Sequence, residues 1–183
     1  MPLEVEQPVE LLEELVQEAR KGSLLSFEKI VEQCQDRLFT YLVQLLGNPH
    51  DAEDVAQETF IKAFKYLHAF DGRARFSTWL YAIAKNTAFT HLRKRKPQQP
   101  IEELAEILPA PAQNIDPDQR DSIWTLAREL KPKLFEVLWL FYGEGFSLKE
   151  IAGITKTNAV TVRVNLHRAR AALGKKFKLR EPL

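Results

Sequence analysis

Cysteine is nearly absent from this chain of 183 residues, and Cys34 is the only one. A single thiol excludes an internal disulfide framework and a cysteine-rich zinc site, and it is typical of proteins in a reducing cytosol. No apolar run approaches the ~20 residues of a membrane-spanning helix. The first ten residues, MPLEVEQPVE, lack the basic start and apolar run of an export signal. We therefore expect a cytoplasmic protein without membrane insertion, in which Cys34 packs as a small side chain.

Patterns typical of enzymes are missing as well. The sequence contains no strand pattern, no internal repeat and no glycine-rich phosphate loop. The carboxylates fall on faces that are expected to be exposed, no serine, histidine and aspartate have suggestive spacing, and the four histidines are scattered. His167 has no second metal ligand one helical turn away. We therefore expect a protein that is not an enzyme, with no catalytic residues, no metal and no cofactor.

Charge is balanced overall but strongly segregated. Lysine and arginine number 26 against 25 acids, for a net charge of +1, which neither supports nor excludes a polyanionic partner. Two stretches, residues 73–96 and 159–180, each carry seven basic residues and no acid. Residues 97–118 are instead rich in proline and acids, a composition that predicts a poorly ordered, flexible linker.

Apolar residues at helical spacing predict an all-α protein with two small helical domains. After a loose tail at residues 1–8, helices are expected at 9–21, 26–46, 51–67 and 78–95, with Ser77 as the N-cap of the last. These helices would form a bundle over residues 9–96. An acidic linker over 97–119 would join it to a second domain, residues 120–183. In that domain an apolar face is predicted to comprise Ile123, Leu126, Ala127, Leu130, Leu134, Val137, Leu138 and Phe141.

The second domain ends in a helix-turn-helix pattern. The sequence SLKE, from Ser147 to Glu150, is a capping box that starts a short helix over 148–154. A turn at Lys156 and Thr157 follows, and Asn158 is a good N-cap for a longer helix over 159–177. The core stripe of this helix is predicted to be Ala159, Val162, Leu166, Ala169 and Leu173.

The opposite side of that last helix combines apolar and basic residues, namely Val160, Arg163, Val164, His167, Arg168 and Ala171. Exposed valines fit a solvated helix poorly, but they can contact thymine methyl groups in a major groove. Arginines there can bind guanines or phosphates. We therefore favour DNA reading over an ordinary basic helix.

The stretch around residues 70–96 combines basic charge with aromatic rings. A short loop, residues 71–75, precedes a helix whose core face is predicted to hold Trp79, Leu80, Ile83, Ala84 and Thr87. A different face holds Ala82, Asn86, Phe89 and Arg93. Cations that follow phosphates and rings that stack on unpaired bases are what a single-strand binder needs. The alternative is a solvated basic helix end in which Asn86 merely caps or packs within its own bundle.

The helix that starts near Asp51 has an inner face of Ala52, Val55, Ala56, Thr59, Phe60 and Ala63. Its outer face holds Asp51, Asp54, Gln57, Glu58 and Ile61. An exposed isoleucine within a charged rim is typical of a protein-binding patch, and such acids would repel DNA. The alternative is an ordinary acidic outer face.

Together these blocks resemble the extracytoplasmic-function sigma factors of bacterial RNA polymerase. Residues 9–96 are similar to sigma region two through DAEDVAQETF, which begins at Asp51, and FSTWLYAIAKNTA, which begins at Phe76. Residues 120–177 are similar to region four through TVRVNLHRAR, which begins at Thr161. The chain departs from the family at Thr90, where an aspartate is common, and at Val164 and Asn165, where serine and arginine are common.

The resemblance implies a transcription initiation factor that binds core RNA polymerase and promoter DNA. The polymerase-binding set would be Asp51, Asp54, Gln57, Glu58 and Ile61, placed against the clamp helices of the largest subunit. The set for melting and reading the −10 element would be Asp71, Gly72, Arg73, Arg75, Phe76, Ala82, Asn86, Phe89 and Arg93. The set for the −35 element would be Val160, Arg163, Val164, His167, Arg168 and Arg170. The resemblance also implies contact with the polymerase flap region, a linker that threads toward the active cleft, and restraint by an anti-sigma factor.

Two other hypotheses stay open at this point. One is a conventional helix-turn-helix regulator in which residues 1–96 form a sensor or dimerisation domain. The other is an enzyme with a DNA-binding tail. A melting loop and an acidic polymerase face argue against the first, and the lack of site residues argues against the second.

Overall fold

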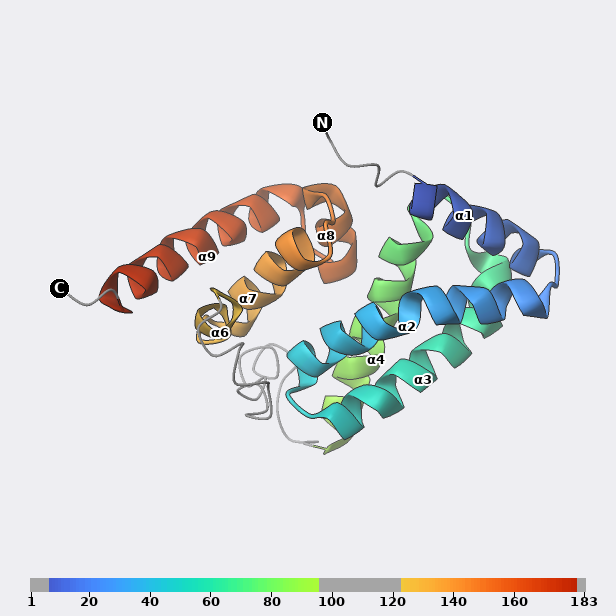
Figure 1. The fold of residues 1–183 in the computed structure, drawn as a ribbon, viewed down its shortest axis with the longest axis horizontal. Helices are drawn as coiled ribbons and strands as arrows, with labels where there is room; N and C mark the ends of the chain where they lie inside the picture. The colour runs from blue at the N-terminus through green and yellow to red at the C-terminus, as the bar shows by residue number, and fades with distance from the viewer. Residues whose placement is uncertain (1–6, 96–122, 181–183) are drawn as a thin grey trace.

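The computed structural model describes residues 7–95 and 123–180, and within these ranges every regular element is helical (Figure 1). This confirms the all-α prediction for the described residues, whereas the predicted linker and residues 1–6 of the predicted tail lie outside them. The first domain comprises α1 (Gln7–Arg20), α2 (Leu24–Leu46), α3 (Pro49–Tyr66), the 3-10 turn η1 (Leu67–Ala69) and α4 (Phe76–Arg95). The second comprises α6 (Ile123–Ala127), α7 (Pro132–Leu138), the π-helical turn η3 (Trp139–Gly143), α8 (Leu148–Thr155) and α9 (Ala159–Arg180).

Local capping defines the ends of α2 and the start of α3. The Ser23 hydroxyl accepts a hydrogen bond from the Ser26 amide at 3.2 Å, so α2 begins two residues before its predicted start. Gly47 ends α2 with a φ of 69°, a left-handed conformation that favours glycine. Asn48 then caps α3 by accepting from the His50 amide at 2.9 Å, and Pro49 occupies the first turn.

The structure corrects two predictions about where helices start, one at α4 and one at α1. Ser77 is not the N-cap of α4, because the helix already begins at Phe76. The Phe76 amide donates to Glu13 Oε1 at 2.9 Å, so a carboxylate on α1 satisfies this helix end. Helix α1 itself begins at Gln7, so the predicted tail is shorter than residues 1–8. A cap from a distant residue leaves no signal in the local sequence, which explains the error.

The core of the first domain follows the predicted faces. On α3, Ala52, Val55, Thr59 and Ala63 are buried, and Ala56 and Phe60 are half-buried. On α4, Leu80, Ala84 and Thr87 are buried, and Trp79 and Ile83 are half-buried. Tyr81 is also buried, outside the predicted core face, because its ring packs between Tyr41 and Phe146 with both centroids 5.0 Å away. Phe146 belongs to the second domain, so Tyr81 marks the place where the domains meet.

Around α7 the second domain buries two of the predicted residues, Val137 and Leu138, together with two that were not predicted. Phe135, Val137, Leu138 and Leu140 are buried, whereas Leu134 and Phe141 are only half-buried. Leu140 lies three residues beyond Val137, on the same side of the helical chain, and it is buried with Val137 at the start of the π-helical turn Trp139–Gly143.

The helix-turn-helix pattern is confirmed. Ser147 and Glu150 form the capping box of α8, and Lys156 ends it with a φ of 53°. Asn158 Oδ1 accepts from the Thr161 amide at 2.8 Å and caps α9. Val162, Leu166, Ala169 and Leu173 are buried as predicted. Ala159 is exposed, because residues 156–160 all remain at the surface through the turn.

Candidate functional site

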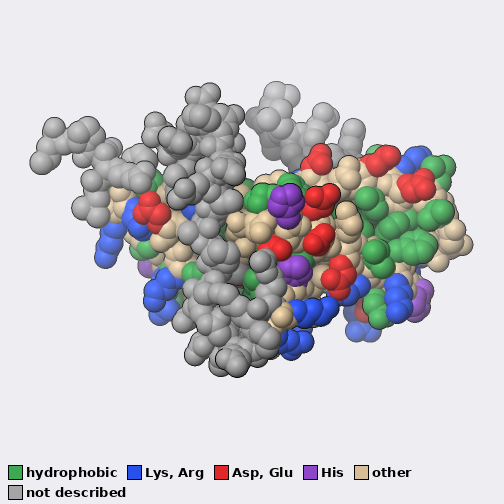
Figure 2. All heavy atoms as spheres, turned by 90° about the horizontal axis from the view of Figure 1, so that it is seen from below, with side chains coloured by type: hydrophobic (Ala, Val, Ile, Leu, Met, Phe, Trp, Pro, Cys, Tyr) green, Lys and Arg blue, Asp and Glu red, His purple; other side chains and the backbone are tan. Residues whose placement is uncertain are grey.

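The outer face of α3 is exposed and acidic. Asp54, Gln57 and Ile61 are exposed, and Ile61 retains 67% of its accessible surface. Figure 2 shows acidic side chains gathered beside a hydrophobic area on the side of the molecule where α3 lies. The Glu58 carboxylate pairs with Lys62 Nζ at 2.7 Å, and this hydrogen bond and the lysine charge hold the pKa of Glu58 below its ordinary value.

Asp51 differs from the other predicted members of that face. Its Oδ1 lies 3.2 Å from His91 Nε2 on α4, and its side chain is only 16% exposed. The structure adds Phe64, which the sequence analysis missed although it lies one turn beyond Ile61. Phe64 is 52% exposed, and its ring contacts Phe27 with centroids 4.9 Å apart. The exposed surface is therefore Asp54, Gln57, Glu58, Ile61 and Phe64, which we call the acidic face.

The loop before α4 is exposed along its whole length, residues 71–75. Asp71 Oδ1 accepts from the Arg73 amide at 3.0 Å, and Asp71 Oδ2 lies 3.3 Å from Arg73 Nε. Gly72, with a φ of 75°, allows the chain to turn there. Phe76, which was also predicted to touch DNA, is not exposed as residues 71–75 are. It is fully buried against Phe70 and Trp79, so its role in this conformation is packing.

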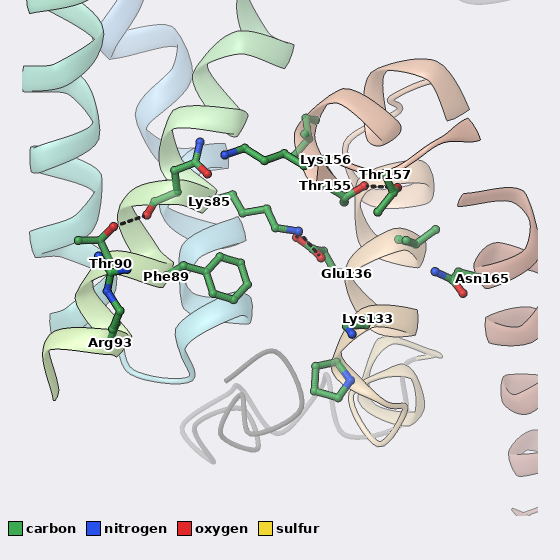
Figure 3. A pocket seen from close by; sticks show the side chains of 14 residues that line it. Lys85, Phe89, Thr90, Arg93, Lys133, Glu136, Thr155, Lys156, Thr157 and Asn165 are labelled. Carbon is green, nitrogen blue, oxygen red and sulfur yellow. Dashed lines mark hydrogen bonds and ion pairs between the residues drawn. The ribbon is translucent and has the colours of Figure 1, made fainter. Parts of the chain in front are cut away.

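Asn86, Phe89 and Arg93 line one wall of a cavity of about 580 Å³ between α4 and the second domain (Figure 3). Asn86 is exposed, and within the described part of the chain its side-chain amide makes no hydrogen bond. Its backbone carbonyl accepts from Thr90 Oγ1 at 2.9 Å. The amide is therefore neither a cap nor a packing group in its own bundle. Ala82, the other predicted member of this face, is half-buried.

The opposite wall of the cavity belongs to the second domain and includes Lys133, Glu136, Thr155, Lys156 and Asn165. In Figure 3, Lys156 extends from the turn of the helix-turn-helix across the cavity toward α4. A cavity lined by an aromatic ring, amides and several cations has the chemistry to receive a base and its phosphate.

A buried ion pair joins the two walls. Lys85 Nζ lies 2.8 Å from both carboxylate oxygens of Glu136, and the two side chains are 13% and 9% exposed. The same carboxylate accepts from the Tyr41 hydroxyl at 3.1 Å. Burial, followed by the charge of Glu136, raises the pKa of Tyr41, so the hydroxyl stays protonated as a donor. The sequence analysis did not predict a role for Glu136. The one local feature that could have indicated a buried partner is that this acid lies within an apolar stretch of α7.

Two further acids of the second domain reach basic residues of the first. Glu150 Oε1 accepts from Thr78 Oγ1 at 3.2 Å and lies 3.6 Å from Arg75 Nε. Glu144 Oε2 lies 3.2 Å from Arg37 Nε. Burial alone would raise the pKa of Glu150, but hydrogen bonds from Ser147 and the charge of Arg75 together lower it.

The outward side of α9 carries the residues predicted for the −35 element. Val160 is 69% exposed and Val164 42%, and Arg163, His167 and Arg168 are exposed beside them. Arg170 is already engaged within the domain. Its Nε donates to the Tyr142 hydroxyl at 2.7 Å, and its guanidinium lies 5.4 Å from the Tyr142 ring centroid.

The described residues hold no candidate metal site and no membrane-spanning helix. Among them, no group of three or more histidine, cysteine, aspartate or glutamate side chains is arranged to hold a metal ion. None of the described helices is long and apolar enough to cross a membrane.

Solved structures share this fold. The chain superposes with a TM-score of 0.68 on CnrH in complex with the cytosolic domain of CnrY, at 23% identity over 93% of this chain and 99% of that one. It superposes with a TM-score of 0.67 on the sigma factor RpoE in complex with the anti-sigma factor NepR from Bartonella quintana. There the identity is 24% over 85% of this chain and 98% of that one.

Sequence comparisons identify the family as well as the fold. The family model of sigma-70 region 2 matches residues 30–98, and that of sigma-70 region 4 matches residues 120–173. The ECF RNA polymerase sigma factor SigW of Bacillus subtilis is 31% identical over 92% of this chain and 97% of its own. The ECF RNA polymerase sigma-E factor of Escherichia coli K12 is 31% identical over 88% and 92%. Both sigma regions are thus present in order, and the chain belongs to the extracytoplasmic-function sigma factors of RNA polymerase.

Proposed function

We propose that this sigma factor divides its work among three surfaces. The acidic face on α3 binds the clamp helices of core polymerase. The loop at residues 71–75 and the cavity-lining side of α4 melt the −10 element and capture an unpaired base. The outward side of α9 reads the −35 element. Residues 9–96 and 120–183 would then be the two functional domains.

The observation that carries this proposal is the side of α4 that holds Asn86, Phe89 and Arg93. The Asn86 amide offers a hydrogen-bond donor and an acceptor to a base edge. In the same lining, the Phe89 ring can stack on a base and Arg93 can bind a phosphate. Extruding a base costs a few kcal/mol of unstacking and unpairing, which contacts of this kind can offset. The amide is exposed and unbonded within the described chain, so it is available for a base edge.

The proposed partners follow from the same surfaces and from the comparisons. The acidic face suits a basic protein surface, and the second domain suits promoter DNA and the polymerase flap region. Two structural neighbours are complexes with CnrY and with the anti-sigma factor NepR, which supports an anti-sigma factor as a further partner of this chain. The factor would have no catalysis of its own and would act in the cytoplasm, where the polymerase transcribes the chromosome.

Replacing Asn86 by alanine tests the base-capture role. We expect Asn86→Ala to keep normal helicity, thermal stability and core binding, because the amide makes no bond within the described chain. Closed complexes still form, but open complexes become rare. Permanganate reactivity of unpaired thymines measures them. A template with a pre-melted bubble should not fully rescue the variant, because the base contact itself is missing.

Gln35→Ala, which removes an exposed amide on α2, is the matched control and should open promoters normally. Early unfolding of Asn86→Ala would give the residue a structural role instead. Promoter opening at the normal rate would place base capture elsewhere on α4.

A further inference from the structure

The cavity between α4 and the second domain carries more positive charge than its own carboxylate balances. Its described lining holds four cationic side chains and one carboxylate, namely Lys85, Arg93, Lys133 and Lys156 with Glu136. Lys85 is paired with Glu136 at 2.8 Å. The other three cations are exposed, and no carboxylate of the described chain forms an ion pair with them. The lining therefore has a net charge of +3, which suits an anion with several charges.

Three separate segments bring these unpaired cations together. Arg93 extends from α4, Lys133 lies in the first turn of α7, and Lys156 extends from the turn of the helix-turn-helix (Figure 3). Lys156 has a φ of 53°, in the left-handed region where asparagine, aspartate and glycine are the usual residues. What lysine supplies at this position is a cation that points across the cavity. An anion bound there would contact both domains at once.

The remaining lining suits a planar base. The half-buried Phe89 ring points from α4 into the cavity (Figure 3), where it can stack on a base. Asn86 on α4 and Asn165 on α9 each offer a hydrogen-bond donor and an acceptor to a base edge. Val137 and Ile154 add apolar surface to the second wall. The volume, about 580 Å³, lies within the ~300–1,000 Å³ of ordinary ligand pockets.

Two simpler occupants would leave part of this lining unused. One nucleotide of a DNA strand carries a single phosphate charge, so it would balance only one of the three unpaired cations. An inorganic anion could bind the cations but would make no use of the ring or the amides. A nucleoside with two or three phosphates matches both parts of the lining, because it combines a base with several adjacent negative charges.

We propose that the cavity binds a nucleoside di- or triphosphate between the two domains. The base stacks on Phe89 and its edge bonds to Asn86, while the phosphates bind Arg93, Lys133 and Lys156. The inference goes beyond the proposed function, because its ligand is a small soluble molecule. Two of its cations, Lys133 and Lys156, lie in none of the three proposed surfaces.

Isothermal titration of the full chain with ATP and with GTP tests the site. Inorganic triphosphate and adenosine, the two parts of one such ligand, are titrated alongside. We expect saturable binding of at least one nucleotide. Inorganic triphosphate should bind roughly tenfold more weakly than that nucleotide, because the stacking of the base is lost. Adenosine alone should show no measurable binding, because the cations then have no partner.

The double variant Lys133→Gln with Lys156→Asn removes the two cations of the second wall. Asparagine is chosen at position 156 because it tolerates the left-handed backbone. We expect roughly tenfold weaker nucleotide binding or more, because the net contribution of a hydrogen bond to a charged group corresponds to at least that factor.

Lys149→Gln with Lys175→Gln is the matched control, since it removes two exposed lysines of the same domain outside the cavity lining. This control should bind nucleotides as the unaltered protein does. Circular dichroism checks that each variant is folded. If the variant Lys133→Gln with Lys156→Asn unfolds, Arg93→Gln on the opposite wall decides the question by the same titration.

Three outcomes would overturn the proposal. In the first, the unaltered protein shows no saturable binding of ATP or GTP. In the second, a folded cavity variant binds nucleotides as tightly as the control does. In the third, inorganic triphosphate binds as tightly as either nucleotide, so the cavity holds an anion without contacting a base. Promoter opening does not enter this test, so a failure of the proposed function would be seen separately in the permanganate assay.

Discussion

At the scale of single residues, the arginines of α9 differ in what they already contact. Arg163 and Arg168 are exposed, and neither is bonded to another side chain within the described chain. Arg170 is held by the Tyr142 hydroxyl and stacks near the Phe141 and Tyr142 rings. Replacing Arg170 would disturb packing as well as any DNA contact. Arg163 and Arg168 are therefore the cleaner probes of −35 reading.

We expect Arg163→Ala and Arg168→Ala each to reduce promoter-specific initiation. A bidentate contact to guanine would cost ~1–3 kcal/mol at a single base position. Loss of a phosphate contact would weaken binding to all sequences equally. It would also lower the slope of log affinity against log salt concentration by about 1. Run-off transcription over a set of promoter variants at several salt concentrations separates the two. Normal initiation by both variants at every promoter would exclude this side of α9 as the −35 reader.

At the scale of elements, α3 presents its charge to solvent while its other face holds the core. We expect Asp54→Lys with Glu58→Lys to weaken core binding by several kcal/mol, because reversed charges would oppose a basic partner at close range. The fold should survive. The lysine introduced at position 58 would face Lys62 one turn later, and a like-charge pair at this spacing costs only about 0.2–0.5 kcal/mol in a helix. Fluorescence titration of core polymerase measures the change.

Glu28→Lys with Glu32→Lys is the matched control, because it has the same spacing and charge change on an exposed part of α2. It should bind core polymerase more tightly than the α3 variant. Equal binding by the α3 variant and the unaltered protein would remove the acidic face from the interface.

The capping box of α8 should make the stability of the fold depend on pH through Glu150. The pKa of Glu150 is lowered in the folded protein, below its ordinary value of 4.5. Its charge therefore stabilises the fold above pH 4.5, and this contribution is lost as the pH falls through the lowered pKa. We expect Glu150→Gln to be less stable than the unaltered protein at pH 7 by about 0.3–1 kcal/mol, the usual value of an acid at a helix N-terminus.

Denaturant titrations at several pH values measure that difference. It should shrink once the pH drops below 4.5, because a protonated glutamate is as uncharged as glutamine. A difference that is constant down to low pH would mean that the charge of Glu150 does not stabilise the fold.

At the scale of the whole molecule, the second domain lies against the cavity-lining side of α4 and leaves the acidic face of α3 open. The acidic face and the cavity-lining side of α4 belong to the same bundle but face different surroundings. We expect a fragment carrying the clamp helices of the largest subunit to bind the unaltered factor and the variant Glu136→Gln with Glu150→Gln with the same affinity. Isothermal titration measures both. Binding that is more than a few-fold tighter for the variant would show that the docked second domain also obstructs α3.

Local sequence patterns predicted the helices, the buried sides of most of them and the resemblance to the family. Helical periodicity predicted the buried sides of α3 and α9, and short-range caps such as Ser147 with Glu150 predicted the helix-turn-helix, because these signals depend on residues within one or two turns. The motif blocks also carried the resemblance that the comparisons confirmed.

Contacts between side chains from distant segments could be seen in the folded structure alone. Glu13 caps α4 from another helix, and Glu136 and Lys85 pair across the domains. Phe76, at the start of α4, turns into the core although the loop just before it is exposed. Glu150 shows both levels in one residue: its cap is local and was predicted, whereas its contact with Arg75 and Thr78 spans the two domains. Such contacts arise from the packing of whole helices, whose geometry no local pattern of residue types encodes.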